Sequence, residues 1–225
     1  DPRGLDQTFT YWASLAPTSL FTGIEELMPG SVRVYETDGS WSDTAFWRPS
    51  YPVQHPDDYP LTLDQATEAL AEKLETATRL RVLRADVPVG SYLSGGLDSS
   101  VTAWMGRKAK QGKFQTYSIR FEDAEYDETE YQRAMAATID SDHQELVVRR
   151  RDIALVFPEV VRHTERPILR TAPAPLYLLS KLVRDSGIKA VLTGEGADEM
   201  LAGYDIFREA RIRESSVILP SSSGT

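Results

Sequence analysis

The fold is decided by the stretch Ser94-Gly95-Gly96-Leu97-Asp98-Ser99-Ser100, which joins the apolar residues 87–93 to residues 101–108, a segment of helical character. A strand, a glycine-rich turn and a helix in this order direct backbone N–H groups and a helix N-terminus toward an anion. Two adjacent glycines let the backbone bend and come close to a ligand. The stretch therefore predicts a phosphate-binding loop at the end of a strand.

The side chains of this loop narrow the kind of phosphate site. Hydroxyl donors come from Ser94, Ser99 and Ser100, whereas the carboxylate of Asp98 repels a phosphate unless a Mg²⁺ ion lies between them. A Walker loop needs a lysine where Asp98 stands, and the dinucleotide fingerprint Gly-x-Gly-x-x-Gly is missing from this stretch. The alternative is an ordinary strand–helix turn in which Asp98 and Ser99 act as caps.

A second acidic, glycine-bearing stretch is Thr193-Gly194-Glu195-Gly196-Ala197-Asp198-Glu199, which begins at the last residue of the strand expected at residues 189–193. Because the carboxyl ends of parallel strands lie at one edge of a sheet, we expect it beside the first loop. The carboxylates of Asp98 and Asp198 near one polyphosphate indicate a Mg²⁺ site, since hard oxygen ligands suit Mg²⁺ and not zinc. The alternative is a polar turn in which Asp198 caps a helix.

Strand and helix patterns alternate from residue 62 onward. Thr62 and Gln65 form a capping-box pattern before a helix that runs to about Arg84. Strands are expected at residues 87–93, 114–121, 143–148 and 189–193, and further helices at 101–108, 128–139, 152–163 and 176–185. This alternation predicts an α/β fold with a parallel, doubly wound sheet that is covered on both faces.

The N-terminal part of the chain has a different pattern. Residues 31–35 alternate like a strand, Asp38-Gly39 marks a turn, and residues 45–47 are expected to form the second strand of a short β-hairpin. Four prolines in residues 48–60 exclude a regular element and predict a linker. We therefore divide the chain into residues 1–53 and residues 54–225.

Composition excludes several classes of function. The net charge of −9 argues against a nucleic-acid substrate, because nucleic-acid binders usually carry a basic excess. No apolar run approaches the roughly 20 residues that span a bilayer, so no membrane partner is expected. The absence of cysteine excludes disulfides and thiolate metal sites and favours a cytoplasmic protein. His55, His143 and His163 have no metal-ligand spacing, so each is expected to be a surface or a satisfied core residue.

Together these features resemble the glutamine-dependent asparagine synthetase family, within the ATP-pyrophosphatase group. The resemblance is carried by residues 87–90, 94–100, 171–175, 177–180, 192–199 and 203–204. It implies that residues 54–225 are the N-terminal part of an ATP-pyrophosphatase (adenine nucleotide alpha hydrolase-like) synthetase domain. Residues 1–53 would be the C-terminal tail of a glutaminase domain, with the β-hairpin as its remnant.

The resemblance also implies roles for individual residues. The phosphates of ATP would be held by Ser94, Gly95, Gly96, Ser99 and Ser100, and the Mg²⁺ ion by Asp98 and Asp198. The adenosine would be framed by Leu93 and Ile119, and the AMP moiety would lie beside Thr193 and Gly194. The catalytic residue would be Glu195, which would handle the protons of the ammonia nucleophile as a general base or orienting group.

The implied reaction is the ATP-dependent formation of an amide. A substrate carboxylate, aspartate in the prototype, attacks the α-phosphorus of ATP and releases pyrophosphate, and ammonia derived from glutamine then attacks the acyl-adenylate. We expect only small-molecule substrates, and a homodimer for the full-length form. The alternatives are another adenylating enzyme of this group, either β-lactam synthetase-like or acting on a different acid, and a non-catalytic nucleotide-binding scaffold.

Two features of the family are missing from the sequence. The cysteine nucleophile of the glutaminase domain is absent, and so is the downstream half of the synthetase domain, which in the family supplies a lysine and much of the acyl-substrate pocket. We therefore expect a fragment of a longer protein that is inactive in amide synthesis by itself.

Overall fold

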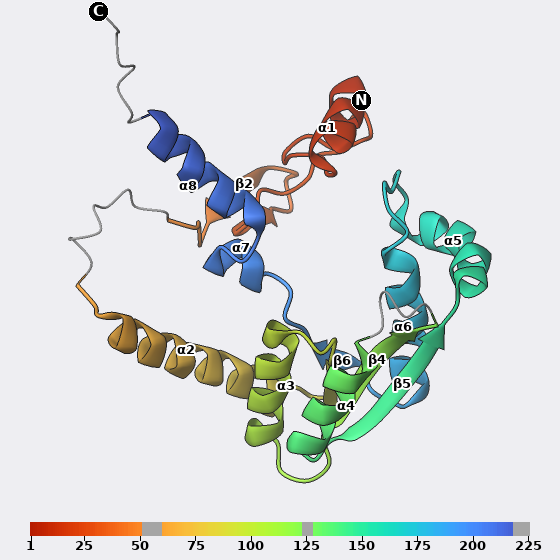
Figure 1. Ribbon diagram of the computed structural model, residues 1–225. Helices are drawn as coiled ribbons and strands as arrows, with labels where there is room; N and C mark the ends of the chain where they lie inside the picture. The colour runs from red at the N-terminus through yellow and green to blue at the C-terminus, as the bar shows by residue number, and fades with distance from the viewer. Residues whose placement is uncertain (51–59, 123–127, 218–225) are drawn as a thin grey trace, which may run out of the picture. The chain divides into compact units, whose positions relative to one another are not determined.

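The computed structural model describes residues 1–50, 60–122 and 128–217 (Figure 1). The chain divides into two compact units. The first unit combines residues 1–68 with residues 150–178, and the second combines residues 69–149 with the chain from residue 179 onward. The expected boundary between residues 53 and 54 lies within residues 51–59, outside the described residues, so the division into 1–53 and 54–225 stays a prediction.

The first unit contains helix α1 (Pro2–Tyr11), a β-hairpin and helix α5 (Arg150–Thr164). The hairpin pairs β1 (Ser31–Tyr35) with β2 (Trp41–Ala45) in antiparallel register. A hairpin was expected, but the placement of its second strand at residues 45–47 is wrong. The tight turn explains the difference: Gly39 N donates to Glu36 O at 3.0 Å, so pairing resumes at once between Tyr35 and Trp41.

The second unit is built on a four-stranded sheet. Its strands are β3 (Val89–Tyr92), β4 (Gln115–Phe121), β5 (Asp142–Val148) and β6 (Ala190–Leu192). They lie in the order β5-β4-β3-β6, and every neighbouring pair is parallel. The α/β fold with a parallel sheet is therefore confirmed.

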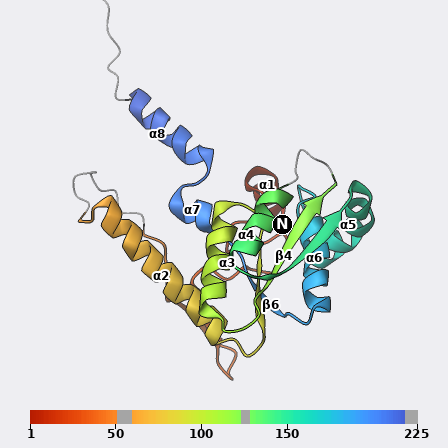
Figure 2. The ribbon, with the colours of Figure 1, turned by 60° about the horizontal axis from the view of Figure 1, so that its bottom comes forward.

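Helices cover both faces of this sheet. On one face, Leu93 packs with Ala103 of α3 (Leu97–Ala109) and with Ala136 of α4 (Thr129–Thr138). On the other face, Tyr117 packs with Leu179 and with the rest of the C-terminal part of α6 (Pro173–Asp185). Figure 2 shows α3 and α4 on the opposite side of the sheet from α6. The residues buried on the two faces are those of the inner strands β3 and β4 above all, whereas the edge strand β5 has a single buried residue, Val148.

Helix α2 (Leu63–Leu83) begins at the predicted capping box. Thr62 N donates to Gln65 Oε1 at 2.9 Å, and Gln65 N donates to Thr62 Oγ1 at 3.3 Å. No helix among the described residues is both long enough and apolar enough to cross a membrane.

Three helices start earlier than expected. Helix α3 begins at Leu97 and not at residue 101. Helix α6 begins at Pro173 and not near residue 176, because a proline in the first turn needs no N–H partner. Asp152 was expected to cap its helix but lies inside the first turn of α5, where a carboxylate is favourable near the helix N-terminus.

Candidate functional site

The first loop of the site leaves the end of β3 and enters α3 within four residues. Gly95 has a φ of +92°, a conformation that side chains with a Cβ rarely adopt. A Cβ at this position would also lie 3.1 Å from Tyr131 Cβ of α4. Glycine is thus required here both for the turn and for the close approach of α4.

Two serine hydroxyls hold the loop in shape. Ser94 Oγ and Ser99 Oγ are hydrogen-bonded to each other at 2.8 Å. Ser94 Oγ also accepts a hydrogen bond from Gly96 N at 3.3 Å. Ser99 Oγ accepts from Ser94 N and donates to Gly96 O, both at 3.1 Å. Ser99 is buried, whereas Ser94 is exposed. These two hydroxyls stabilise the turn itself, a role that the sequence pattern does not distinguish from phosphate binding.

The N-terminus of α3 is open to an anion. Its N-cap residue is Gly96, which provides no capping side chain, and no described side chain replaces it. The N–H groups of residues 97–99 belong to the first turn, which has no intrahelical acceptor for them. Such N–H groups, together with the helix dipole, are where proteins bind anions, and phosphate binding at this helix end stays a prediction.

The second loop lies directly against this helix end. Strand β6 pairs with β3, and a Cβ on Gly194 would lie 2.9 Å from Asp98 Cβ and 3.0 Å from Ser99 N. The backbone of the second loop thus touches the first turn of α3. The prediction that both loops lie at one edge of one sheet is confirmed.

Acidic side chains gather on the second loop and on the segment that follows it. Tyr204 donates its hydroxyl to Glu199 Oε1 at 2.9 Å. The pKa of Tyr204 is raised first by this hydrogen bond and also by the negative charges of Asp198 and Glu195. Glu195 is exposed, and Asp198 is half-buried in the first turn of α7 (Ala197–Leu201).

Asp98 and Asp198 supply the donor chemistry that a Mg²⁺ ion needs. Asp98 lies in the first turn of α3 against Gly194, and Gly194 O accepts from Ala197 N at 3.3 Å in the turn that leads to Asp198. The described residues hold no group of three or more His, Asp or Glu side chains arranged around a metal position. Two carboxylates fit an ion that takes its other ligands from phosphate oxygens and water.

Leu93 and Ile119, which are predicted to frame the adenosine, direct their side chains into the core. The Leu93 side chain is fully buried in the core, and Leu93 O accepts from Ser118 Oγ at 2.6 Å. The Ile119 side chain packs on the opposite face of the sheet, while Thr193 follows β6 and is exposed. Ser100 N donates to Gly96 O at 3.1 Å in the first turn of α3.

Gln132, which no sequence motif indicates, also contacts the first loop. Gln132 lies in α4, is 3% exposed, and donates its side-chain amide to Ser94 O and to Ile119 O. The sequence pattern of a helix does not reveal that one of its polar side chains donates hydrogen bonds to two strand ends, because the pattern does not show which elements pack against the helix.

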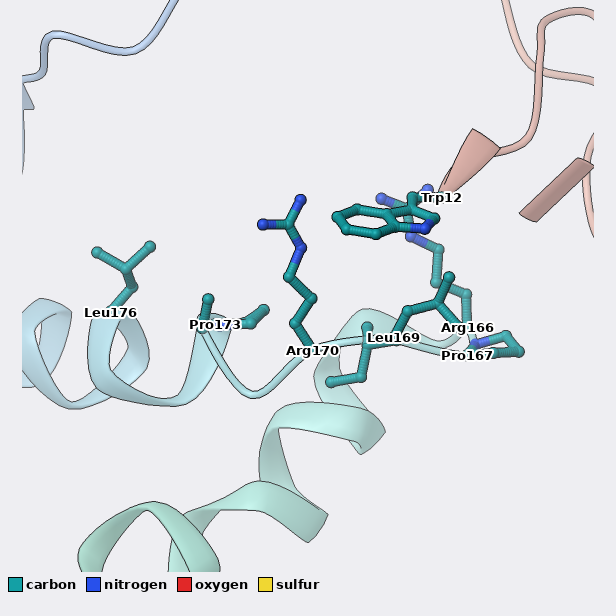
Figure 3. A pocket seen from close by; sticks show the side chains of 9 residues that line it. Trp12, Arg166, Pro167, Leu169, Arg170, Pro173 and Leu176 are labelled. Atoms are coloured by element: carbon teal, nitrogen blue, oxygen red, sulfur yellow. The ribbon is translucent and has the colours of Figure 1, made fainter. Parts of the chain in front are cut away.

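A separate pocket of about 250 Å³ lies in the first unit. Its lining includes Trp12 and Arg170, and the Arg170 guanidinium carbon lies 4.0 Å from the centre of the Trp12 ring (Figure 3). This distance is typical of a cation–π contact. The lining contains none of the residues predicted to bind ATP or Mg²⁺.

Comparison with known proteins agrees with the motifs. The family model described as Asparagine synthase matches residues 69–222. The asparagine synthetase [glutamine-hydrolyzing] 1 of Bacillus subtilis is 28% identical over 210 residues, which cover 93% of this chain and 32% of the relative. Amidase chry2 of Gibberella zeae is 32% identical over 213 residues, which cover 88% of this chain and 31% of the relative.

The chain spans about a third of the length of these relatives. Among solved structures, the glutamine-dependent NAD+ synthetase from Acinetobacter baumannii in complex with ADP is similar with a TM-score of 0.47 and 19% identity, over 76% of this chain and 31% of that one. The family model covers more than half of the residues, and it includes both loops of the site. The chain belongs to the asparagine synthase family.

Proposed function

We propose that this chain forms the ATP-binding part of a ligase that adenylates a carboxylic acid and converts it to an amide. The observation that carries the proposal is the contact of Gly194 with the first turn of α3, which brings two glycine-bearing, acidic loops together at one sheet edge. Membership of the asparagine synthase family supports the class of reaction.

In this proposal the first loop binds the β- and γ-phosphates of ATP. The backbone N–H groups of Gly95, Gly96 and residues 97–99 would hold the phosphates, and Ser94, Ser99 and Ser100 would shape and complete the site. Donors fixed in place before the reaction stabilise the charge that develops on the leaving pyrophosphate.

Asp98 and Asp198 would hold the Mg²⁺ ion. When bound there, the ion would neutralise negative charge on the pyrophosphate. Because the two carboxylates belong to different loops, they also limit where the polyphosphate can lie along the sheet edge.

The remaining residues would orient the nucleoside and the acyl group. The backbones of Leu93 and Ile119 end neighbouring strands and would frame the adenosine, with Thr193 and Gly194 beside the AMP moiety. Glu195 is exposed on the second loop and would accept or orient the protons of the attacking ammonia.

The names of two relatives concern the identity of the carboxylic acid substrate. One relative is called an asparagine synthetase [glutamine-hydrolyzing] and another an amidase, so the substrate is aspartate or a different acid. We propose glutamine as the source of ammonia, with residues 1–53 as the end of the glutaminase domain and 54–225 as the start of the synthetase domain. Dimerisation and a cytoplasmic location are part of the same proposal, and the isolated chain is expected to be inactive.

ATP–pyrophosphate exchange in the complete natural protein, with a panel of carboxylic acids, tests this function. Exchange that depends on aspartate identifies an asparagine-forming enzyme, and exchange with another acid identifies a related adenylating enzyme. Replacing Asp98 by Asn, which keeps the size of the side chain, should lower exchange by about 10²-fold or more, because the active site loses a carboxylate that would hold Mg²⁺. ATP binding without exchange for any acid would leave only a nucleotide-binding scaffold and overturn the proposal.

A further inference from the structure

Gln132 ties together the ends of two neighbouring strands. From α4 its side-chain nitrogen donates to Ser94 O at 3.2 Å, just beyond β3, and to Ile119 O at 3.1 Å, near the end of β4. It is 3% exposed, so both hydrogen bonds are shielded from water. One side chain thus sets the separation of the two strand ends at the edge where the phosphate loop begins.

The same residue packs against the loop itself. A Cβ on Gly95 would lie 3.4 Å from Gln132 Cγ and 3.4 Å from Gln132 N. Helix α4 is therefore the surface on which the loop rests, and the turn at Gly95 cannot move toward it without a clash.

The oxygen of this amide is left without a partner. Gln132 Oε1 is buried and has no hydrogen-bond partner among the described residues. The orientation of the amide is fixed, because the two groups facing its nitrogen are both carbonyl acceptors. A buried acceptor with no donor destabilises a fold, so the hydrogen bonds to Ser94 O and Ile119 O have to outweigh this cost.

We infer that Gln132 is a positioning residue that fixes the direction of the phosphate loop for ATP. The Ser94 carbonyl and the Gly95 N–H belong to one planar peptide unit and point in opposite directions. When Gln132 holds the carbonyl, the Gly95 N–H is held on the opposite side of that plane. This inference rests on the proposed binding of ATP by residues 94–100.

The test compares Gln132→Met with Gln144→Met in the complete natural protein. Methionine keeps the length of the side chain but cannot donate. Gln144 is the control because its side chain is also hydrogen-bonded, although it is half-buried and Gln132 is buried. It lies in β5, where its Oε1 accepts from Ser186 Oγ at 3.1 Å. KM for ATP and kcat are measured by ATP–pyrophosphate exchange, and stability by the urea midpoint.

The expected result separates positioning from packing. Gln132→Met should raise KM for ATP on the order of tenfold and change kcat less than about threefold. The urea midpoint should also fall, because the carbonyl groups of Ser94 and Ile119 lose their donor. Gln132→Asn keeps the amide on a shorter side chain and should give an intermediate KM. Gln144→Met should leave KM for ATP unchanged. An unchanged KM in Gln132→Met, or a lower urea midpoint as its only effect, overturns the inference.

Hydrogen exchange distinguishes this outcome from a failure of the proposed function. If the unmodified protein catalyses no ATP–pyrophosphate exchange in the presence of any acid, the proposed function has failed. The amides of residues 94–100 should nevertheless exchange faster in Gln132→Met than in Gln144→Met, because the strand ends are no longer tied. Equal exchange rates in the two variants overturn the inference by themselves.

Discussion

At the residue scale, the contact of Gly194 with α3 determines whether the two loops can form one site. A Cβ there would lie 2.9–3.0 Å from Asp98 Cβ, Asp98 C and Ser99 N, and two of these three atoms belong to the backbone. Gly194→Ala must therefore push the second loop away from the helix end. We expect ATP affinity to fall at least about tenfold and the free energy of unfolding to fall by ~1–3 kcal/mol.

Gly112→Ala is the control for this prediction. Gly112 has a φ of +82° but no atom within 4 Å of the position of a Cβ, and it lies in the turn before β4, at the opposite edge of the sheet. The alanine should cost ~1–2 kcal/mol through its backbone conformation alone and leave the Kd for ATP unchanged. Calorimetric titration with ATP and urea unfolding give both quantities. Unaltered ATP affinity in Gly194→Ala would contradict the site.

The hydrogen bonds and the pKa of His143 depend on the side chains around it. Its Nδ1 lies 2.8 Å from Thr116 Oγ1 and its Nε2 lies 3.2 Å from Ser118 Oγ, so it is a satisfied core residue, as expected. Burial lowers its pKa, an effect that Glu145 opposes in part. The unfolded chain therefore binds a proton more readily than the folded one.

Stability should consequently fall as the pH drops through and below about 6.5, the ordinary pKa of histidine that the unfolded chain retains. In His143→Asn the fall in the free energy of unfolding between about pH 7 and pH 5.5 should be smaller than in the unmodified protein. Urea unfolding at several pH values measures this slope. The same slope in both proteins would show that His143 is not the group responsible.

At the element scale, the alternation of strand and helix patterns was sufficient to predict every strand of the parallel sheet, including the edge strand β5, which is only partly buried. Residues 143–148, for example, were expected as a strand, and β5 spans Asp142–Val148. Helix α1 was not recognised, although Asp1 accepts from Arg3 N at 2.9 Å and is followed by Pro2. An aspartate N-cap followed by a proline is a sequence signal for the start of a helix.

The contacts between elements could not be predicted from the sequence in the same way. The pattern placed both glycine-rich loops at one edge, because parallel topology alone dictates this. Gln132 was missed because its partners, Ser94 O and Ile119 O, are backbone atoms of other elements. Likewise, no pattern indicates that the hydroxyls of Ser94 and Ser99 bind each other at 2.8 Å.

Helix α6 gives a test of packing at this scale. Leu179 is 3% exposed and packs with Tyr117, Val183 and Ile188, whereas Leu176, one turn earlier in the same helix, is 47% exposed. Leu179→Ala should lower the free energy of unfolding by ~2–5 kcal/mol, and Leu176→Ala should change it by less than ~1 kcal/mol. Circular dichroism in urea measures both. Equal losses would contradict the packing of α6 on the sheet.

At the scale of the whole molecule, the chain forms two units, and both predicted ATP loops belong to the second. Binding to the folded state alone stabilises a protein by about 2.7 kcal/mol when the ligand is present at 100 times its Kd. ATP with Mg²⁺ should therefore raise the melting temperature of the second unit, made of residues 69–149 and the chain from residue 179 onward. The first unit should melt at an unchanged temperature if the two units unfold separately.

The tryptophans allow the two transitions to be assigned. Trp104 lies in α3 of the second unit, and Trp12, Trp41 and Trp47 belong to the first. In Trp104→Phe, tryptophan fluorescence reports the unfolding of the first unit only, while circular dichroism reports the unfolding of both units. With ATP and Mg²⁺, we expect the circular dichroism transition to move upward and the fluorescence transition of this variant to stay in place. EDTA should remove most of the shift, because the carboxylates of Asp98 and Asp198 repel a polyphosphate that carries no metal ion. A shift confined to the fluorescence transition would place the nucleotide on the first unit and contradict a site built on the two loops.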